Sequence, residues 1–301
     1  MRLGLVQERW RSDPEEHEAA LAAGVAAAAR EGAELVCLQE LTLSRYLDGA
    51  APEELLGGQT LAFAARAARV GGVHVVASLY ERADGAARGG FNTAIVVSPA
   101  GELVSRTRKL HIPSSAGYGE DAVFAPGPAG ADAFPLAAVC GARVATPTCY
   151  DQWFPEVARA YALAGADVIV YPSAIGTEVR RPGLDTQPMW QQVIVANGIA
   201  NGTFMAAVNR VGAEGEMTFY GSSFVSDPYG RVLAQAPRDE PAVVVAELDF
   251  EARRDWLELF PFFRARRPDA YGPLVERGAQ PPGLATMSAT TSTSTASSSR
   301  A

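Results

Sequence analysis

The sequence predicts an α/β fold in which helices cover a mixed β-sheet. Short apolar runs typical of buried strands alternate along the chain with Ala-rich amphipathic segments typical of helices. Some strand runs are joined directly by Pro and Gly turns, which indicates hairpins and therefore a sheet that is not purely parallel. The chain has 301 residues, of which 48% are hydrophobic and 20% charged, as in an ordinary globular protein.

The expected strands are apolar runs bounded by turn residues. They span 3–6, 34–38, 73–80, 92–98, 142–145, 167–171, 204–209, 222–227 and 242–248. Pro99-Ala100-Gly101 is a turn signal that joins the run at 92–98 to the segment 102–110 as a hairpin. A second turn is expected in the segment DPYGR, at 227–231.

The expected helices lie between these strands, at 12–32, 60–71, 155–164 and 186–201. The first has the clearest boundaries. Asp13 is a favourable N-cap, Pro14 suits the first helical position, and Glu16 is placed for a capping box. Gly32 and Gly165 are natural stops for the first and third helices.

Charge and composition exclude several classes of function. A net charge of −8 argues against a general affinity for nucleic acid or an anionic membrane. The start, MRLGLVQERW, lacks the apolar core of a signal peptide. No apolar segment approaches the roughly 18 residues of a membrane span. We therefore expect a cytoplasmic protein without a nucleic-acid or membrane partner.

The cysteines and the composition of the C-terminal segment predict how the chain is organised. Three cysteines with no CxxC pair, and three scattered histidines, predict neither a disulfide framework nor a metal site. Residues 285–301 are rich in Ser, Thr and Ala with a single charged residue, so they cannot bury enough apolar surface to offset their ordering entropy. We expect one domain at 1–279 and a disordered tail at 280–301.

Three polar residues follow predicted strands, where functional groups gather in α/β sheets. Glu40 follows LVCL, Lys109 follows the run VSRTR, and Cys149 follows the strand at 142–145. Each has an ordinary explanation alone: a capping carboxylate, a solvated basic stretch and a packed cysteine.

Together, the three side chains predict nucleophilic catalysis by a thiol. A cysteine nucleophile needs a base, which Glu40 supplies, and Glu40 can later activate water. Lys109 and the Tyr150 N–H can stabilise a tetrahedral oxyanion. A helix that begins soon after Cys149 would add its N-terminal dipole. No histidine stands in a comparable position, which disfavours a Cys-His protease.

The motifs around these residues resemble those of the nitrilase superfamily of carbon–nitrogen hydrolases. Glu40 in CLQELT, Lys109 in RKLHIP and Cys149 in CYDQWFPE are similar to the Glu-Lys-Cys triad of that family. The segment GYGEDAVFAPGP is similar to the family's loop with a second glutamate, here Glu120, which would position the lysine and the substrate. The resemblance extends from about residue 2 to 276.

The resemblance implies a fold and an activity on a small-molecule substrate. The fold would be a four-layer α-β-β-α sandwich of two mixed sheets with outer helices, in a homodimer or a larger homo-oligomer, with no metal and no organic cofactor. DQWFPE, YPSAIGTE and TFYGSS are most similar to the N-carbamoylputrescine amidase branch, which converts N-carbamoylputrescine to putrescine, CO2 and ammonia through a cysteine thioester. The alternatives are an N-carbamoyl amino acid hydrolase, an aliphatic or ω-amidase, and a catalytically silent homologue that acts as a binding partner.

Substrate-binding residues are expected near Cys149. Tyr150 and Trp153 follow it directly, and Tyr46 lies in the segment after Glu40. Glu178 could hold an amine.

Other charges and one proline leave alternatives open. Asp185 could hold the amine instead of Glu178, whereas Arg180 and Arg181 could bind a substrate carboxylate. Pro147 departs from the family pattern and should end the preceding strand early or make it bulge.

Overall fold

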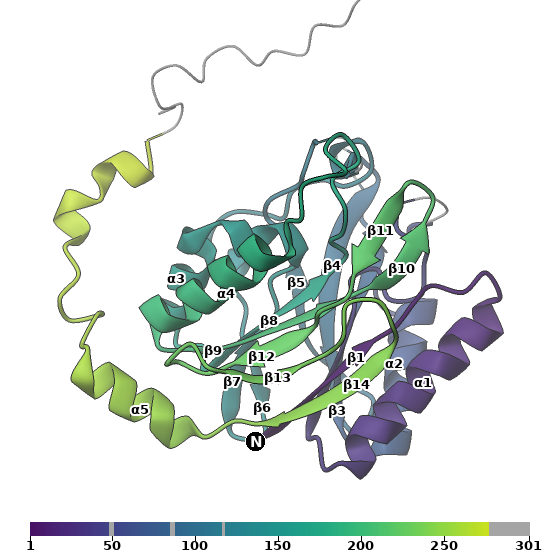
Figure 1. Cartoon of the computed structure of the whole chain (residues 1–301), viewed down its shortest axis with the longest axis horizontal. Helices are drawn as coiled ribbons and strands as arrows, with labels where there is room; N and C mark the ends of the chain where they lie inside the picture. Colours follow the sequence, from purple (N-terminus) through teal and green to yellow (C-terminus); the bar gives the residue numbers. More distant parts are fainter. Residues whose placement is uncertain (48–50, 85–87, 116–117, 277–301) are drawn as a thin grey trace, which may run out of the picture. The chain divides into compact units, whose positions relative to one another are not determined.

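Two six-stranded mixed sheets form the centre of the fold (Figure 1). The computed structural model describes residues 1–47, 51–84, 88–115 and 118–276. The expected tail at 280–301 lies outside the described residues. Within the part of the chain that is described, no helix is both long enough and apolar enough to cross a membrane.

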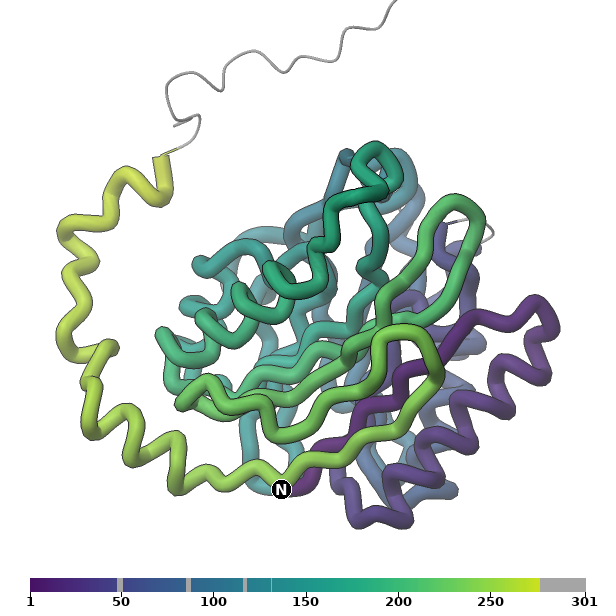
Figure 2. The backbone as a smooth tube through the Cα atoms, in the orientation of Figure 1, coloured from purple at the N-terminus to yellow at the C-terminus, as the bar shows by residue number. Residues whose placement is uncertain are grey.

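The first sheet has the strand order β14-β1-β2-β3-β4-β5. β1, β2 and β3 are parallel, and the other neighbours are antiparallel. The bounds are β1 (Arg2–Gln7), β2 (Leu35–Leu38), β3 (His74–Arg82), β4 (Gly90–Val97), β5 (Leu103–Arg108) and β14 (Ala242–Glu247). β1 and β14 are the first and the last strand of the described chain, and they lie side by side (Figure 2).

The second sheet has the order β13-β12-β9-β8-β7-β6, with a parallel centre of β7, β8 and β9. The bounds are β6 (Ala137–Val139), β7 (Ala142–Ala145), β8 (Val168–Ser173), β9 (Phe204–Asn209), β12 (Phe224–Ser226) and β13 (Val232–Gln235). A separate hairpin is formed by β10 (Val211–Glu214) and β11 (Met217–Tyr220).

The sheets and helices pack as four layers, as predicted (Figure 1). α1 (Pro14–Arg30) and α2 (Gln59–Gly71) cover the outer face of the first sheet, through a core that includes Leu21 and Phe63. α3 (Pro155–Ala164) and α4 (Gln187–Asn201) cover the second sheet, with Tyr161 and Trp190 inside. Apolar side chains from both sheets, such as Leu5 from β1 and Val170 from β8, form the core between them.

Three of the signals that bound α1, namely Asp13, Pro14 and Gly32, act as predicted. The Asp13 carboxylate accepts hydrogen bonds from the N–H groups of Glu15 and Glu16, which otherwise have no partner within the helix. Pro14 is the first helical residue, and Gly32, just after the helix, has a φ of +84°. β7 ends at Ala145, as the position of Pro147 predicts.

Some elements were not predicted. β6 and β13 are short edge strands, and the helix α5 (Phe250–Leu259) has no buried residue. None of these three elements therefore has a long apolar run in the sequence. The predicted action of a helix dipole on Cys149 stays a prediction, because α3 does not begin directly after this residue. Cys149–Trp153 form a 3₁₀ helix, and α3 begins only at Pro155. The field of a helix terminus falls off within one turn.

The described residues after Phe262 belong to a separate compact unit. It contains two short 3₁₀ helices, Pro268–Ala270 and Gly272–Leu274. An ion pair joins Arg267 to Asp269, with 2.6 Å between Nη2 and Oδ2.

Candidate active site

Glu40, Lys109 and Cys149 come from both sheets and are all buried. Glu40 follows β2, Lys109 follows β5 and Cys149 begins the 3₁₀ helix after β7. Lys109 and Glu40 have no exposed surface, and Cys149 is 4% exposed. Polar groups placed so deeply need partners, because an unpaired buried charge is strongly destabilising.

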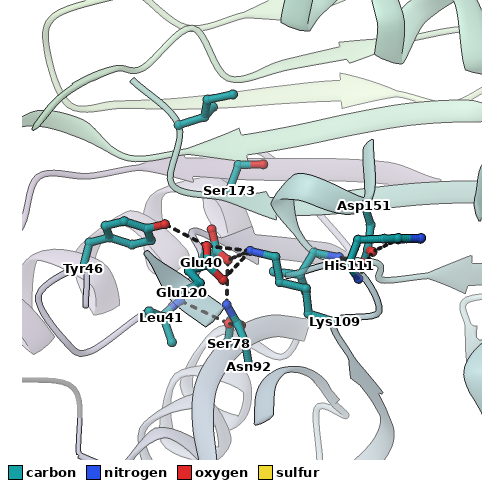
Figure 3. A network of polar contacts seen from close by, with 12 residues as sticks. Glu40, Leu41, Tyr46, Ser78, Asn92, Lys109, His111, Glu120, Asp151 and Ser173 are labelled. Atoms are coloured by element: carbon teal, nitrogen blue, oxygen red, sulfur yellow. Dashed lines mark hydrogen bonds and ion pairs between the residues drawn. The ribbon is translucent and has the colours of Figure 1, made fainter. Parts of the chain in front are cut away.

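Lys109 joins two carboxylates (Figure 3). Its Nζ lies 2.8 Å from Oε1 of Glu40, and 2.8 Å and 2.7 Å from Oε1 and Oε2 of Glu120. Burial acts to lower the pKa of Lys109, but the charges of Glu120 and Glu40 outweigh it and raise the pKa above its ordinary value. The lysine is therefore a permanent cation in the site.

The two carboxylates share this single cation. Burial raises the pKa of Glu120 to about 7, although Lys109 acts in the opposite direction. Both Glu120 oxygens accept from Lys109, and Oε1 also accepts from the Tyr46 hydroxyl at 2.7 Å. In contrast, Oε2 of Glu40 is buried and has no hydrogen-bond partner among the described residues.

Cys149 sits in a tight turn with a φ of +41°, a backbone region that only Gly visits freely. Burial raises the pKa of its thiol well above the usual value, and the charge of Glu40 adds to the rise, whereas Lys109 opposes it. The resting side chain is therefore a neutral thiol, which needs a base before it can act as a nucleophile.

Asp151 ties the Cys149 turn to the segment after Lys109. Its carboxylate accepts from the main-chain N–H of Thr148 at 3.2 Å and of His111 at 2.9 Å, and it lies 2.8 Å from Nδ1 of His111. The His111 ring stacks on Phe154, with 3.6 Å between the ring centroids. Asp151 is 1% exposed, so its carboxylate makes these contacts inside the protein. Sequence reasoning gave it no role.

Arg210 holds the turn that carries Glu40. Its guanidinium is fully buried and donates to the main-chain oxygens of Glu40 at 3.0 Å, and of Leu41 and Ser44 at 2.6 Å each. Nη1 of Arg210 lies 2.7 Å from Oε1 of Glu214, whose Oε2 accepts from the Tyr46 N–H. This arginine lies in the segment NRVG at 209–212, whose position in the sequence does not indicate a contact with Glu40.

A cavity of about 260 Å³ opens beside Cys149. The residues that line it are Pro113, Ser115, Tyr118, Cys149, Tyr150, Trp153, Ile175 and Glu178. The predicted substrate-binding residues Tyr150, Trp153 and Glu178 thus lie on this cavity, whereas Tyr46 contacts Glu120 instead. Partial burial raises the pKa of Glu178.

The other charges of the loop after β8 lie elsewhere. Asp185 pairs with Arg238 through two contacts of 2.9 Å, and Arg180 and Arg181 are exposed to solvent. None of these residues lines the cavity beside Cys149. Within the described ranges, no group of three His, Cys, Asp or Glu side chains is placed to hold a metal ion.

Comparison with known proteins gives consistent matches. The family model described as Carbon-nitrogen hydrolase matches residues 2–258. N-carbamoylputrescine amidase from Solanum tuberosum is 36% identical over 83% of this chain and 87% of its own length. Citrullinase from Francisella tularensis is 37% identical over 67% and 70%. The crystal structure of a carbon-nitrogen hydrolase from Helicobacter pylori G27 superposes with a TM-score of 0.81 at 32% identity, and the match covers 92% of this chain and 99% of that one.

Proposed function

The chain belongs to the carbon–nitrogen hydrolase family, and from this premise we propose that it hydrolyses an N-carbamoyl amine, with N-carbamoylputrescine as the first candidate. The observation that carries the proposal is the cavity beside Cys149, in which Glu178 is the one charged side chain among the lining residues of the described chain. A partly buried carboxylate favours a substrate with a cationic tail, because it gains a charge-assisted hydrogen bond.

The proposed first half-reaction uses Cys149, Glu40 and Lys109. The Cys149 sulfur attacks the ureido carbon, while its proton moves to the free oxygen Oε2 of Glu40. The Lys109 ammonium and the Tyr150 N–H stabilise the oxyanion that forms. The bond from carbon to the terminal nitrogen then breaks. Ammonia leaves with the proton that Glu40 returns, and a carbamoyl thioester remains on Cys149.

The second half-reaction regenerates the thiol. Glu40 takes a proton from a water molecule, whose oxygen attacks the thioester carbon. The C–S bond breaks and Cys149 recovers a proton from Glu40. The released carbamic acid decomposes to CO2 and the free amine. Glu120 supports both halves by holding Lys109, to which both of its oxygens are hydrogen-bonded.

Relatives of the chain support a ureido substrate but differ in its tail. N-carbamoylputrescine ends in an amine alone, whereas citrulline, the substrate in the name of the Francisella tularensis relative, ends in both an amine and a carboxylate. Arg180 and Arg181 are not among the described residues that line the cavity, and the charged residue that does line it, Glu178, would repel a substrate carboxylate. This favours the diamine derivative.

The decisive experiment is ammonia release by the purified protein from N-carbamoylputrescine, citrulline and N-carbamoyl-β-alanine, measured side by side. We expect turnover of the first, none with Cys149→Ala, and a raised KM with Glu178→Gln. Glu178→Gln keeps the shape of the side chain and removes only its charge. Preference for N-carbamoyl-β-alanine, or full activity of Cys149→Ala, would refute the proposal. Equal KM values for Glu178→Gln and the wild type would show that the Glu178 charge does not contribute to substrate binding.

We also propose that the protein forms a homodimer through its second sheet and the helices that cover it. Large apolar side chains are exposed there on α3 (Leu163), α4 (Met189) and the edge strand β13 (Val232 and Leu233). Exposed apolar groups that cluster on one part of a protein often mark an interface. Sedimentation equilibrium should give the mass of a dimer, and a monomer at micromolar concentration would contradict the proposal.

A further inference from the structure

The two carboxylate oxygens of Glu40 have different surroundings. Oε1 accepts a hydrogen bond from Nδ2 of Asn92 at 2.7 Å and one from Nζ of Lys109 at 2.8 Å. Oε2 has no partner among the described residues, although the side chain is completely buried. One oxygen is therefore fixed in place and the other is left open. A base that accepts a single proton from one direction requires this asymmetry.

Asn92 belongs to a closed ring of hydrogen bonds that begins and ends at Glu40 (Figure 3). The N–H of Leu41, the residue after Glu40, donates to Oγ of Ser78 at 3.1 Å. Ser78 Oγ donates to Oδ1 of Asn92 at 3.3 Å, and Nδ2 of Asn92 donates to Glu40. A carboxylate can only accept hydrogen bonds, so the NH2 group of Asn92 faces Glu40 and the amide oxygen is left to accept the Ser78 proton. This fixes which end of the amide faces Glu40.

The ring is built on two interior strands of the first sheet. Ser78 lies on β3 and Asn92 on the neighbouring strand β4, and both side chains have no exposed surface. The turn after Glu40 is fixed to β3 by further bonds between Thr42 and Ser78. Leu41 has a φ of +48°, so this turn needs such support. Glu40 and its amide partner are thus held by the same two strands.

Lys109 alone does not give Glu40 this orientation. Its ammonium can rotate, and it also binds both oxygens of Glu120. The other titratable groups whose charges act with that of Glu40 are Glu120, Cys149, Tyr46 and Tyr118, while Arg210 binds the Glu40 main-chain oxygen. Asn92 differs from all of these because its planar amide is neutral and is fixed at both ends. Its single donated bond therefore sets the rotation of the carboxylate.

We propose that Asn92, oriented by Ser78, is the positioning residue of the base. It holds Oε1 so that Oε2 is presented to the Cys149 thiol. The inference rests on the proposed function only in that Glu40 accepts the thiol proton. It needs no knowledge of the substrate, since transfer of the proton from Cys149 precedes any choice between ureides.

The test follows the alkylation of Cys149 by iodoacetamide as a function of pH, measured by mass spectrometry of the Cys149 peptide. Asn92→Ala should slow this alkylation by about 10-fold or more, because the carboxylate loses a charge-assisted hydrogen bond and its orientation. The acidic limb of the pH profile should also change, because that limb reports the base that removes the thiol proton. A residue with a merely structural role would leave that limb in place.

Two controls come from the same molecule. Thr93, the next residue on β4, is equally buried and donates to a different carboxylate, Oε2 of Glu81, at 2.7 Å. Thr93→Val should lower the stability and leave the pH profile of Cys149 unchanged. Cys140 is exposed, so its alkylation rate reports the reagent itself and should be equal in all variants.

An alkylation rate and an acidic limb in Asn92→Ala that match those of Thr93→Val would overturn the inference. If Asn92→Ala fails to fold, Ser78→Ala takes its place, because it leaves the amide but removes the hydroxyl that orients it. Slower alkylation of Cys149 in Ser78→Ala supports the inference, and an unchanged alkylation rate overturns it. Absence of turnover with every ureide would refute the proposed substrate, and these alkylation rates would still decide the role of Asn92.

Discussion

Arg210 should be among the most important side chains for the stability of the protein. We consider Arg210→Met, which keeps an unbranched apolar stem and removes the guanidinium. The side chain has no exposed surface, and its donors reach three main-chain oxygens of the segment 40–44 as well as the carboxylate of Glu214. Because the side chain is fully buried, water can replace these contacts only after the surrounding structure rearranges.

The expected loss follows from what the substitution leaves behind. Glu214, whose side chain is 3% exposed, would lose its ion-pair partner at 2.7 Å. Removing one member of a buried pair is destabilising by about 3–5 kcal/mol. Each main-chain oxygen left without a donor adds about 1–3 kcal/mol, less whatever local relaxation recovers. We therefore expect a loss of at least about 3 kcal/mol, against a total stability of about 5–15 kcal/mol for a typical domain.

Equilibrium unfolding in urea measures this loss, with Arg66→Met as the matched control. Arg66 also forms a short ion pair, 2.6 Å from Glu18, but the two side chains are 58% and 37% exposed. A surface pair contributes about 0–1 kcal/mol, so the control should unfold almost as the wild type does. Equal losses in the two variants would refute the argument that burial, and not pairing alone, gives Arg210 its importance.

A double variant tests whether Arg210 and Glu214 act as a pair. Glu214→Gln in the Arg210→Met background removes the charge that was left unpaired, so part of the lost stability should return. Glu214→Gln alone should be destabilising. If the two single losses simply add in the double variant, Glu214 is not the group that makes Arg210→Met so unfavourable. In that case the main-chain oxygens account for the loss.

Two further predictions concern Glu120 and the C-terminus. The pKa of Glu120 is raised by burial from 4.5 to about 7, so the folded protein binds this proton more tightly than the unfolded chain. Its contribution to stability is fully present below about pH 4.5 and is lost as the pH rises through about 7. Glu120→Gln should flatten the unfolding free energy between pH 5 and 7.5, and an unchanged slope would show that another group titrates there. Removal of residues 281–301 should leave the rate of turnover and the melting temperature nearly unchanged, and a clear drop in either would show that this segment packs against the folded part.

The fold could be predicted from the sequence where burial leaves a continuous apolar pattern. β8 and β9 are buried at every position, and both coincide with predicted runs. The edge strand β13 has no fully buried residue, and α5 has none either, so neither leaves such a pattern. Periodicity also does not reveal that the strands divide into two sheets. That division came from the resemblance of the motifs, and it is confirmed by the observed strand orders.

The site could be predicted only in part, for a related reason. Glu40, Lys109 and Cys149 follow strands, and this position is visible in the sequence. The contacts of Asn92 and Arg210 with Glu40 join residues 52 and 170 positions apart, which no local pattern encodes. One signal was available, because Ser78 is a polar side chain inside an apolar strand run and Asn92 is a polar side chain at the start of another. Such a residue must find a partner when it is buried.

The assignment of different roles to Glu40 and Glu120 follows from their oxygens. The raised pKa of Cys149 means that its proton must move when the sulfur attacks, and the acceptor must have an unoccupied oxygen. Both oxygens of Glu120 are already bound by Lys109, and one is also bound by Tyr46. Glu40 alone of the two has a buried oxygen without a partner among the described residues. We infer that Glu40 is the base and that Glu120 fixes the cation between them. Substitution of Glu120 by Gln should then leave some turnover, whereas Glu40→Gln should leave none.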